Sequence, residues 1–171
     1  RRSGALGKLS ALASVLEARD EYTAEHSTGT SEFACAIARA MGYPASKVSL
    51  LERAALNHDI GKIFVPDSVL LKPGPLTEDE FETMKKHPED GARIIAPTLG
   101  EEVSRIVLHH HERWDGKGYP NGTSGEDIPE MSRIMSVADV YNALVTDRPY
   151  RKKMERETAE KIIFDGAGTL F

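Results

Sequence analysis

A histidine followed directly by an aspartate, His58-Asp59, ends an apolar helical pattern and constrains this sequence more than any other feature. Val48, Leu51 and Ala55 precede the pair at helical spacing, and His58 continues the same stripe. Its ring should therefore face the interior, where an imidazole needs a polar partner. A lone inward histidine is most simply a core residue with one hydrogen bond. An imidazole beside a carboxylate is also a pair of metal ligands.

The other histidines favour the metal interpretation. The six lie beside a carboxylate, beside another histidine or at the end of a predicted helix, at positions 26, 58, 87, 109, 110 and 111. Imidazoles and carboxylates with one cysteine suit iron, manganese or similar divalent ions, because thiolate sites need several cysteines. Cys35 cannot form an internal disulfide and should pack among apolar neighbours. We therefore expect a reducing, cytoplasmic location.

Length and charge exclude several classes of protein. A chain of 171 residues with 40% hydrophobic content can bury the core of one domain, and no run approaches the length of a membrane span. The start at Arg1 lacks an initiator methionine, so we expect a single domain, residues 1–171, excised from a longer protein. The net charge of −5 and the pI near 5.7 argue against a DNA-binding surface. A phosphate ligand would then need local cations or metals.

Apolar periodicity predicts an all-α fold, with no convincing strand. Helical patterns cover approximately residues 6–16, 26–40, 46–59, 66–70, 77–87, 101–111, 134–144 and 155–164. Residues 20–23 should break the first helix, and Gly61 should end the third and leave Lys62 free to reach into a cleft. Thr77 opens a capping box, and Pro88 should end that helix at His87.

Several polar residues lie on inward faces of these predicted helices. His26 shares a stripe with Phe33 and Ile37. His110 shares one with Val103, and His111 follows about 100° around the helix axis, so the two rings can reach different metals. In the next helix, Asp139 and Asn142 are three residues apart and share a face. A carboxylate among apolar neighbours is costly unless it is paired or bound to a metal.

Residues 113–129 form a long predicted loop, rich in turn signals, that includes Asp115-Gly116-Lys117-Gly118-Tyr119-Pro120. A disordered surface excursion is one interpretation. Trp114 and Tyr119 are large aromatic residues that seldom lie idle in such a loop, so we expect Tyr119 or Lys117 to contact a ligand.

Together these motifs resemble the HD-GYP family of bacterial cyclic di-GMP phosphodiesterases. The resemblance spans nearly the whole chain, in the family's order: Thr23 to His26, His58 to Lys62, Pro66-Asp67, Leu71 to Gly74, Leu76-Thr77, His87-Pro88, His110-His111-Glu112, Asp115 to Pro120, Ala138-Asp139-Val140 and Arg148 to Arg151. A His-Asp pair alone would indicate only the wider HD superfamily, which acts on many phosphate esters. The Gly-Tyr-Pro loop narrows the interpretation to cyclic dinucleotides.

The resemblance implies a helical bundle with a metal centre. The implied ligands are His26, His58, Asp59, His87, His110, His111 and Asp139, with Asp59 bridging two metals. Some members hold three metals and have a Glu four residues before the first ligand, where this chain has Tyr22, so we expect two divalent ions, iron or manganese. Asn142 replaces an Asp of many members, which puts in doubt a supporting charge there. The family's usual residues after 168–171 are missing.

The expected reaction is metal-assisted attack of water on a phosphodiester, opening cyclic di-GMP to linear pGpG and then GMP. Asp59 and Lys62 are the candidate catalytic residues, with Lys62 neutralising charge on phosphorus, although a lysine there could simply stabilise a helix end. Lys62, Lys117, Tyr119 and Arg148 are the candidate substrate contacts. The loop could instead bind a protein partner, and an upstream sensory or receiver domain is expected in the full protein.

Two other functions stay open. One is a cyclic-dinucleotide receptor or protein-interaction module with weak or no turnover, against which the complete ligand set and Lys62 argue. The other is an HD hydrolase of another phosphate ester, including a hybrid cyclic dinucleotide. The loop does not select among the bases.

Overall fold

The structure is a computed structural model that describes residues 2–147 and 151–171; the side chains of residues 2, 3, 5 and 21–24 are outside the described set. Helices are the regular elements of this part of the chain. In chain order they are α1 (Arg2–Arg19), α2 (Glu21–Ala40), α3 (Ala45–Asn57), η1 (Ile60–Phe64), α4 (Asp67–Leu70), α5 (Glu78–Met84), α6 (His87–Leu99), α7 (Glu101–Leu108), η2 (Gly125–Asp127), α8 (Glu130–Val145) and α9 (Arg156–Asp165). The predicted all-α fold is confirmed.

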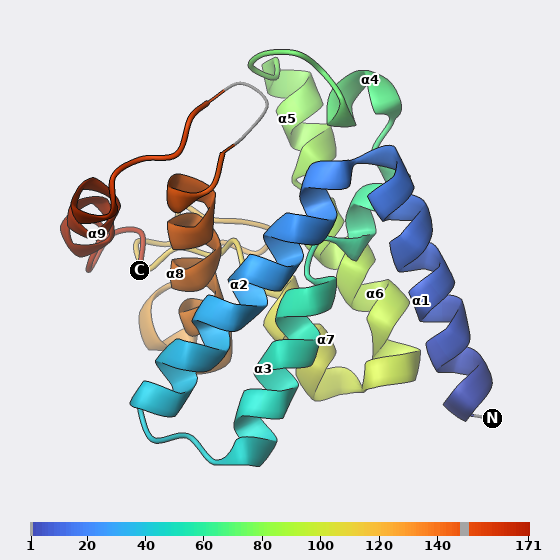
Figure 1. Cartoon of the computed structure of the whole chain (residues 1–171), viewed down its shortest axis with the longest axis horizontal. Helices are drawn as coiled ribbons and strands as arrows, with labels where there is room; N and C mark the ends of the chain where they lie inside the picture. The colour runs from blue at the N-terminus through green and yellow to red at the C-terminus, as the bar shows by residue number, and fades with distance from the viewer. Residues whose placement is uncertain (1, 148–150) are drawn as a thin grey trace.

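Helix α2 crosses the centre of the bundle between α3 and α8, while α1 lies beside α6 at one end and α9 lies against α8 at the other (Figure 1). The apolar faces of these helices form one core, in which Leu51, Ile95, Val107 and Met135 are fully buried. Burial of such side chains stabilises the bundle by about 1.5–3 kcal/mol each. The core thus fixes the helix ends that carry the polar residues. Within the described residues, no helix is long and apolar enough to cross a membrane.

The structure corrects the predicted boundary at His87. The capping box at Thr77 is present, but α5 ends at Met84, and His87 begins a separate helix, α6, that the sequence analysis did not predict. Pro88 lies in the first turn of α6, where a backbone N–H has no partner within the helix and proline is tolerated. Pro97 near the end of the same segment also hid its helical character.

Three further expectations about boundaries were wrong. Only Asp20 separates α1 from α2, and α7 ends at Leu108, so His110 and His111 follow the helix rather than lie on it. Gly61 is inside η1 and does not end α3. A Cβ added to Gly61 would lie 2.0 Å from the carbonyl oxygen of His87, so this glycine permits η1 to pack against the start of α6.

Candidate metal centre

Helices from across the chain, and the residues that directly follow them, bring the expected metal ligands together. His26 comes from α2, the His58-Asp59 pair directly follows α3, His87 begins α6, the His110-His111 pair follows α7, and Asp139 lies on α8. Their donor atoms form two compact groups: His26, His58 and Asp59, and His87, His110 and His111. Within each group the donor atoms lie within 4.8 Å of one another. Six of the seven expected residues are in these groups, and the seventh, Asp139, contacts His26, while their binding of metal remains a prediction.

Three of the histidine rings are oriented by the same backbone contact. The Nδ1 atoms of His58, His87 and His110 lie 2.6, 2.8 and 2.5 Å from the carbonyl oxygen three residues earlier. Since a carbonyl only accepts, each Nδ1 donates its hydrogen, and in the neutral form of the ring the lone pair is on Nε2. Such a contact fixes the tautomer and ring direction of a metal-binding histidine. The local backbone thus prepares three Nε2 atoms as ligands.

Asp59 links the two groups. Its Oδ2 lies 3.5 Å from Nε2 of His58, and its Oδ1 lies 3.4 Å from Nε2 of His87. The Nε2 atoms of His87 and His110 are themselves 3.4 Å apart. One carboxylate therefore presents one oxygen to each histidine group, which is the arrangement a bridging ligand requires.

Asp139 completes the first group. Its Oδ1 lies 2.6 Å from Nε2 of His26 and 3.6 Å from Nε2 of His58. On the same helix, Nδ2 of Asn142 lies 3.0 Å from Nδ1 of His26 and donates to the His26 carbonyl oxygen at 2.8 Å. The expected shared face of Asp139 and Asn142 is confirmed, and both residues contact His26.

Burial and charge act against each other in this site. Burial alone would lower the pKa of His58, but Asp59 and Asp139 raise it to about 9. In the metal-free protein this ring is therefore protonated at pH 7, and a metal would have to displace the proton on Nε2. Burial lowers the pKa of His87 and of His111 to about 3, so these rings are neutral at pH 7. Neutral imidazoles are the form that binds metal.

Lys62 compensates part of the negative charge. Burial would raise the pKa of Asp59, but Lys62, whose Nζ lies 2.7 Å from Oδ2, holds that pKa well below its ordinary value together with the neighbouring histidines. The lysine side chain is 22% exposed, whereas that of Asp59 is 4% exposed. Lys62 therefore lies on the solvent side of the centre and is paired with Asp59, whereas the sequence analysis expected it to be free to reach into a cleft.

Comparison with known proteins agrees with this geometry. A family model described as HD domain matches residues 10–171. The chain belongs to the HD domain family. Members of this family depend on metals, and the two His/Asp groups of this HD domain are suited to hold them.

The HD domain also has curated relatives. It is 43% identical over 166 residues to the cyclic di-GMP phosphodiesterase response regulator RpfG of Xanthomonas campestris, covering 95% of this chain and 44% of the relative. It is 38% identical over 143 residues to 3'3'-cGAMP-specific phosphodiesterase 2 of Vibrio cholerae, covering 82% of this chain and 27% of the relative. The chain thus spans less than half of either protein. The resemblance to HD-GYP phosphodiesterases is confirmed.

A solved structure supports the fold. Bd1817, a HDG"Y"P protein from Bdellovibrio bacteriovorus, matches with a TM-score of 0.70 at 22% identity, covering 99% of this chain and 58% of that protein. At this identity the likeness concerns the fold alone.

The loop of the HD domain, residues 113–129, reaches the rim of the metal centre. We call it the GYP loop. The Tyr119 ring lies over that of His111, with centroids 4.9 Å apart at 32°, and it also meets Phe81 edge-on at 6.1 Å. Lys117 is exposed, and its backbone N–H donates to Oδ1 of Asp115. Arg148 and the side chain of Tyr22 lie outside the described residues.

The sequence analysis did not single out two residues that hold this loop in place, Glu112 and Gly118. Glu112 is 2% exposed, and its carboxylate accepts hydrogen bonds from the loop backbone. A Cβ on Gly118 would lie 2.5 Å from the carbonyl oxygen of His111, so only glycine fits there. The adjacency of Glu112 to the paired histidines was the available signal, although its burial could not be read from the sequence.

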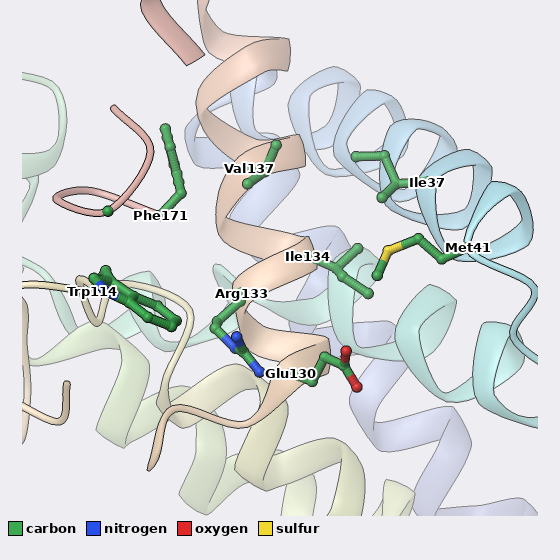
Figure 2. Close-up of a pocket in the computed structure, with 9 residues that line it drawn as sticks. Ile37, Met41, Trp114, Glu130, Arg133, Ile134, Val137 and Phe171 are labelled. Carbon is green, nitrogen blue, oxygen red and sulfur yellow. The ribbon is translucent and has the colours of Figure 1, made fainter. Parts of the chain in front are cut away.

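A separate apolar cavity of about 450 Å³ lies on another side of the HD domain. Trp114 faces it, with Ile37 of α2, Met41 directly after α2, and Ile134 and Val137 of α8 (Figure 2). Its remaining lining comprises Glu130, Arg133, Gly168 and Phe171. None of the metal-ligand candidates lines this cavity. Trp114 thus lies against this cavity, which is not the candidate site.

Proposed function

We propose that this chain is a metal-dependent phosphodiesterase that hydrolyses cyclic di-GMP to linear pGpG and onward to GMP. The observation that carries the proposal is Asp59, whose two oxygens face the two histidine groups at 3.4 and 3.5 Å. Relatives that are named cyclic di-GMP phosphodiesterases support this substrate.

Two divalent ions, iron or manganese, fit these donors. One would be held by His26, His58 and Asp139, the other by His87, His110 and His111, and Asp59 would serve both. Nitrogen and carboxylate donors without thiolates suit such ions, and the oriented Nε2 atoms support the assignment. When bound, two metals polarise phosphoryl oxygens and activate water for in-line attack.

The chain's own residues position and neutralise the substrate. Lys62 holds a positive charge beside Asp59 and faces the rim, where it can offset charge that grows on a phosphate in the transition state. The Tyr119 ring beside His111 offers an aromatic face to a guanine base. Arg148 remains a predicted phosphate contact, and Lys117 remains a predicted substrate contact.

Two alternatives are weighed against this proposal. A receptor without turnover would not need the full set of seven candidate ligands or the partly buried Lys62–Asp59 pair. A phosphodiesterase for a hybrid cyclic dinucleotide has a specific observation in its favour, the 38% identity to a 3'3'-cGAMP-specific relative. Substrate competition separates it from the main proposal.

One experiment tests all three functions. The protein is purified anaerobically, its bound metals are quantified, and cyclic di-GMP, 3'3'-cGAMP and cyclic di-AMP are followed separately by chromatography. We expect two metals per chain and fastest loss of cyclic di-GMP, with pGpG appearing first. Three fully occupied metals per chain would contradict the binuclear centre. Binding of cyclic di-GMP without products from a metal-loaded protein would establish the receptor instead.

The cellular setting is part of the proposal. We propose that residues 1–171 act as a single HD-GYP domain in the cytoplasm, controlled by a sensory or receiver domain of a longer protein. The relative RpfG, named a response regulator, supports such a domain arrangement. A protein partner of the GYP loop remains a prediction.

A further inference from the structure

The carboxylate of Glu112, which is next to the expected ligand His111, holds the backbone of residues 121–123 in the GYP loop. Oε1 accepts a hydrogen bond from the backbone N–H of Asn121 at 2.8 Å, and Oε2 accepts one from that of Thr123 at 3.0 Å. The side chain is completely buried, and it directly follows His111 in sequence. Hydrogen bonds to a buried carboxylate are stronger than those between neutral groups. Oε1 also lies 3.7 Å from Nδ1 of His109, but the two hydrogen bonds to backbone both go to one short segment of the loop.

Between Glu112 and that segment lies Tyr119. Its backbone N–H donates to the carbonyl oxygen of His111 at 3.1 Å, and Gly118 packs so closely on residues 111–113 that a Cβ would clash. The loop is therefore closed on itself, with the Tyr119 ring set across His111. Loss of the two hydrogen bonds to Glu112 would release residues 121–123, which follow Tyr119. The backbone of Tyr119 would then be held only by its own hydrogen bond to the carbonyl oxygen of His111.

We propose that Glu112 is a positioning residue that acts through Tyr119. It holds residues 121–123 so that Tyr119 stays across the ring of His111 at the rim where substrate enters. The effect on turnover rests on the function proposed above, whereas the effect on the loop does not. Glu112 is not one of the expected metal ligands, and its carboxylate accepts its two backbone hydrogen bonds from the loop.

The first test measures the loop directly. Glu112→Gln keeps the shape of the side chain, but its amide NH₂ must face one of two N–H donors, so at least one of the two bonds is lost. We expect amide exchange at Asn121 and Thr123 to accelerate at least tenfold, with little change in the core helices. Glu126→Gln, an exposed carboxyl in the same loop, is the matched control. Unchanged exchange at both amides in Glu112→Gln would overturn the proposal, even for a protein without phosphodiesterase activity.

The second test is a double-mutant cycle on KM. Glu112→Gln should raise KM for cyclic di-GMP about tenfold while kcat and bound metal stay within about twofold. In the Tyr119→Ala background the same substitution should raise KM less than twofold, because the residue it positions is gone. Additive effects would show that Glu112 does not act through Tyr119.

If Glu112→Gln fails to fold, Glu112→Asp replaces it, since the shorter carboxylate keeps its charge but cannot reach both amides. No turnover by the wild type would reject the proposed function and leave the exchange result to decide the role of Glu112.

Discussion

Nε2 of His26 lies 2.6 Å from Oδ1 of Asp139, although 113 residues separate them along the chain. Asn142, one helical turn after Asp139, contacts the other nitrogen of the same ring at 3.0 Å. One face of α8 therefore holds both edges of the His26 imidazole. The packing of α8 on α2 decides where this candidate ligand lies.

A glycine permits that packing, which gives the first prediction. A Cβ on Gly29 would lie 2.6 Å from Oδ1 of Asn142, whose amide is held by several hydrogen bonds. Gly29→Ala should lower the free energy of unfolding by about 1–2 kcal/mol, since overpacking outweighs the gain in helix propensity. It should also reduce bound metal from two ions toward one. Gly7→Ala, where nothing lies within 4 Å, should be neutral or stabilising. Chemical denaturation and metal analysis check this, and wild-type stability with two metals would contradict it.

Asp59→Asn should abolish turnover. The amide cannot offer an anionic oxygen to each histidine group, so we expect kcat to fall at least about 10³-fold and metal content to drop, with the helical fold retained. Circular dichroism reports the fold, and chromatography of the dinucleotide reports activity. Asp165→Asn on exposed α9 should behave as wild type. Near wild-type turnover of Asp59→Asn would mean that the proposed mechanism is wrong.

Tyr119→Ala tests the loop's contact with substrate. The variant should raise KM about tenfold while metal content and Tm stay close to wild type, and Tyr119→Phe, which keeps the ring over His111, should change KM less than threefold. Unchanged purified turnover with lower activity in cells would indicate a protein partner instead. A variant that loses metal and melts early, with unaltered kinetics in its folded fraction, would show that the loop is only structural.

The metal-free protein should be most stable near pH 6.5. His87 and His111 have folded-state pKa values of about 3, below that of an unfolded histidine. The unfolded state therefore binds more protons than the folded state between about pH 3 and 6.5. The free energy of unfolding falls as the pH drops through this range. His58 has a folded-state pKa of about 9, so its contribution is complete below about pH 6.5 and is lost as pH rises through 9. Urea unfolding in chelator across pH 5–9 measures both limbs. Stability that rises steadily from pH 6.5 to 9 would refute the assignment to His58.

The sequence alone determined the helical class and the identity of the clustered residues. Periodicity placed His26 and His58 on inward faces, and both are buried, because a stripe recurring every 3.6 residues must face the core. The seven ligands that the family resemblance implied are neighbours in the structure. Local patterns succeed here because they reflect what one helix must bury.

Tertiary structure alone decided how those residues are arranged. Periodicity extended α7 through His111, whereas the chain leaves the helix after Leu108 and turns the two rings toward the site. The sequence pattern also ended a helix at His87, where α6 in fact begins. Pro88 marks a helix boundary, but a proline is compatible with the residue after a helix as well as with the first turn of the next one. Glycine is needed at positions 29 and 61 because segments distant in sequence pack there. Glu112 is buried because the loop folds over it. No local pattern encodes such contacts, since they exist only once the helices have packed.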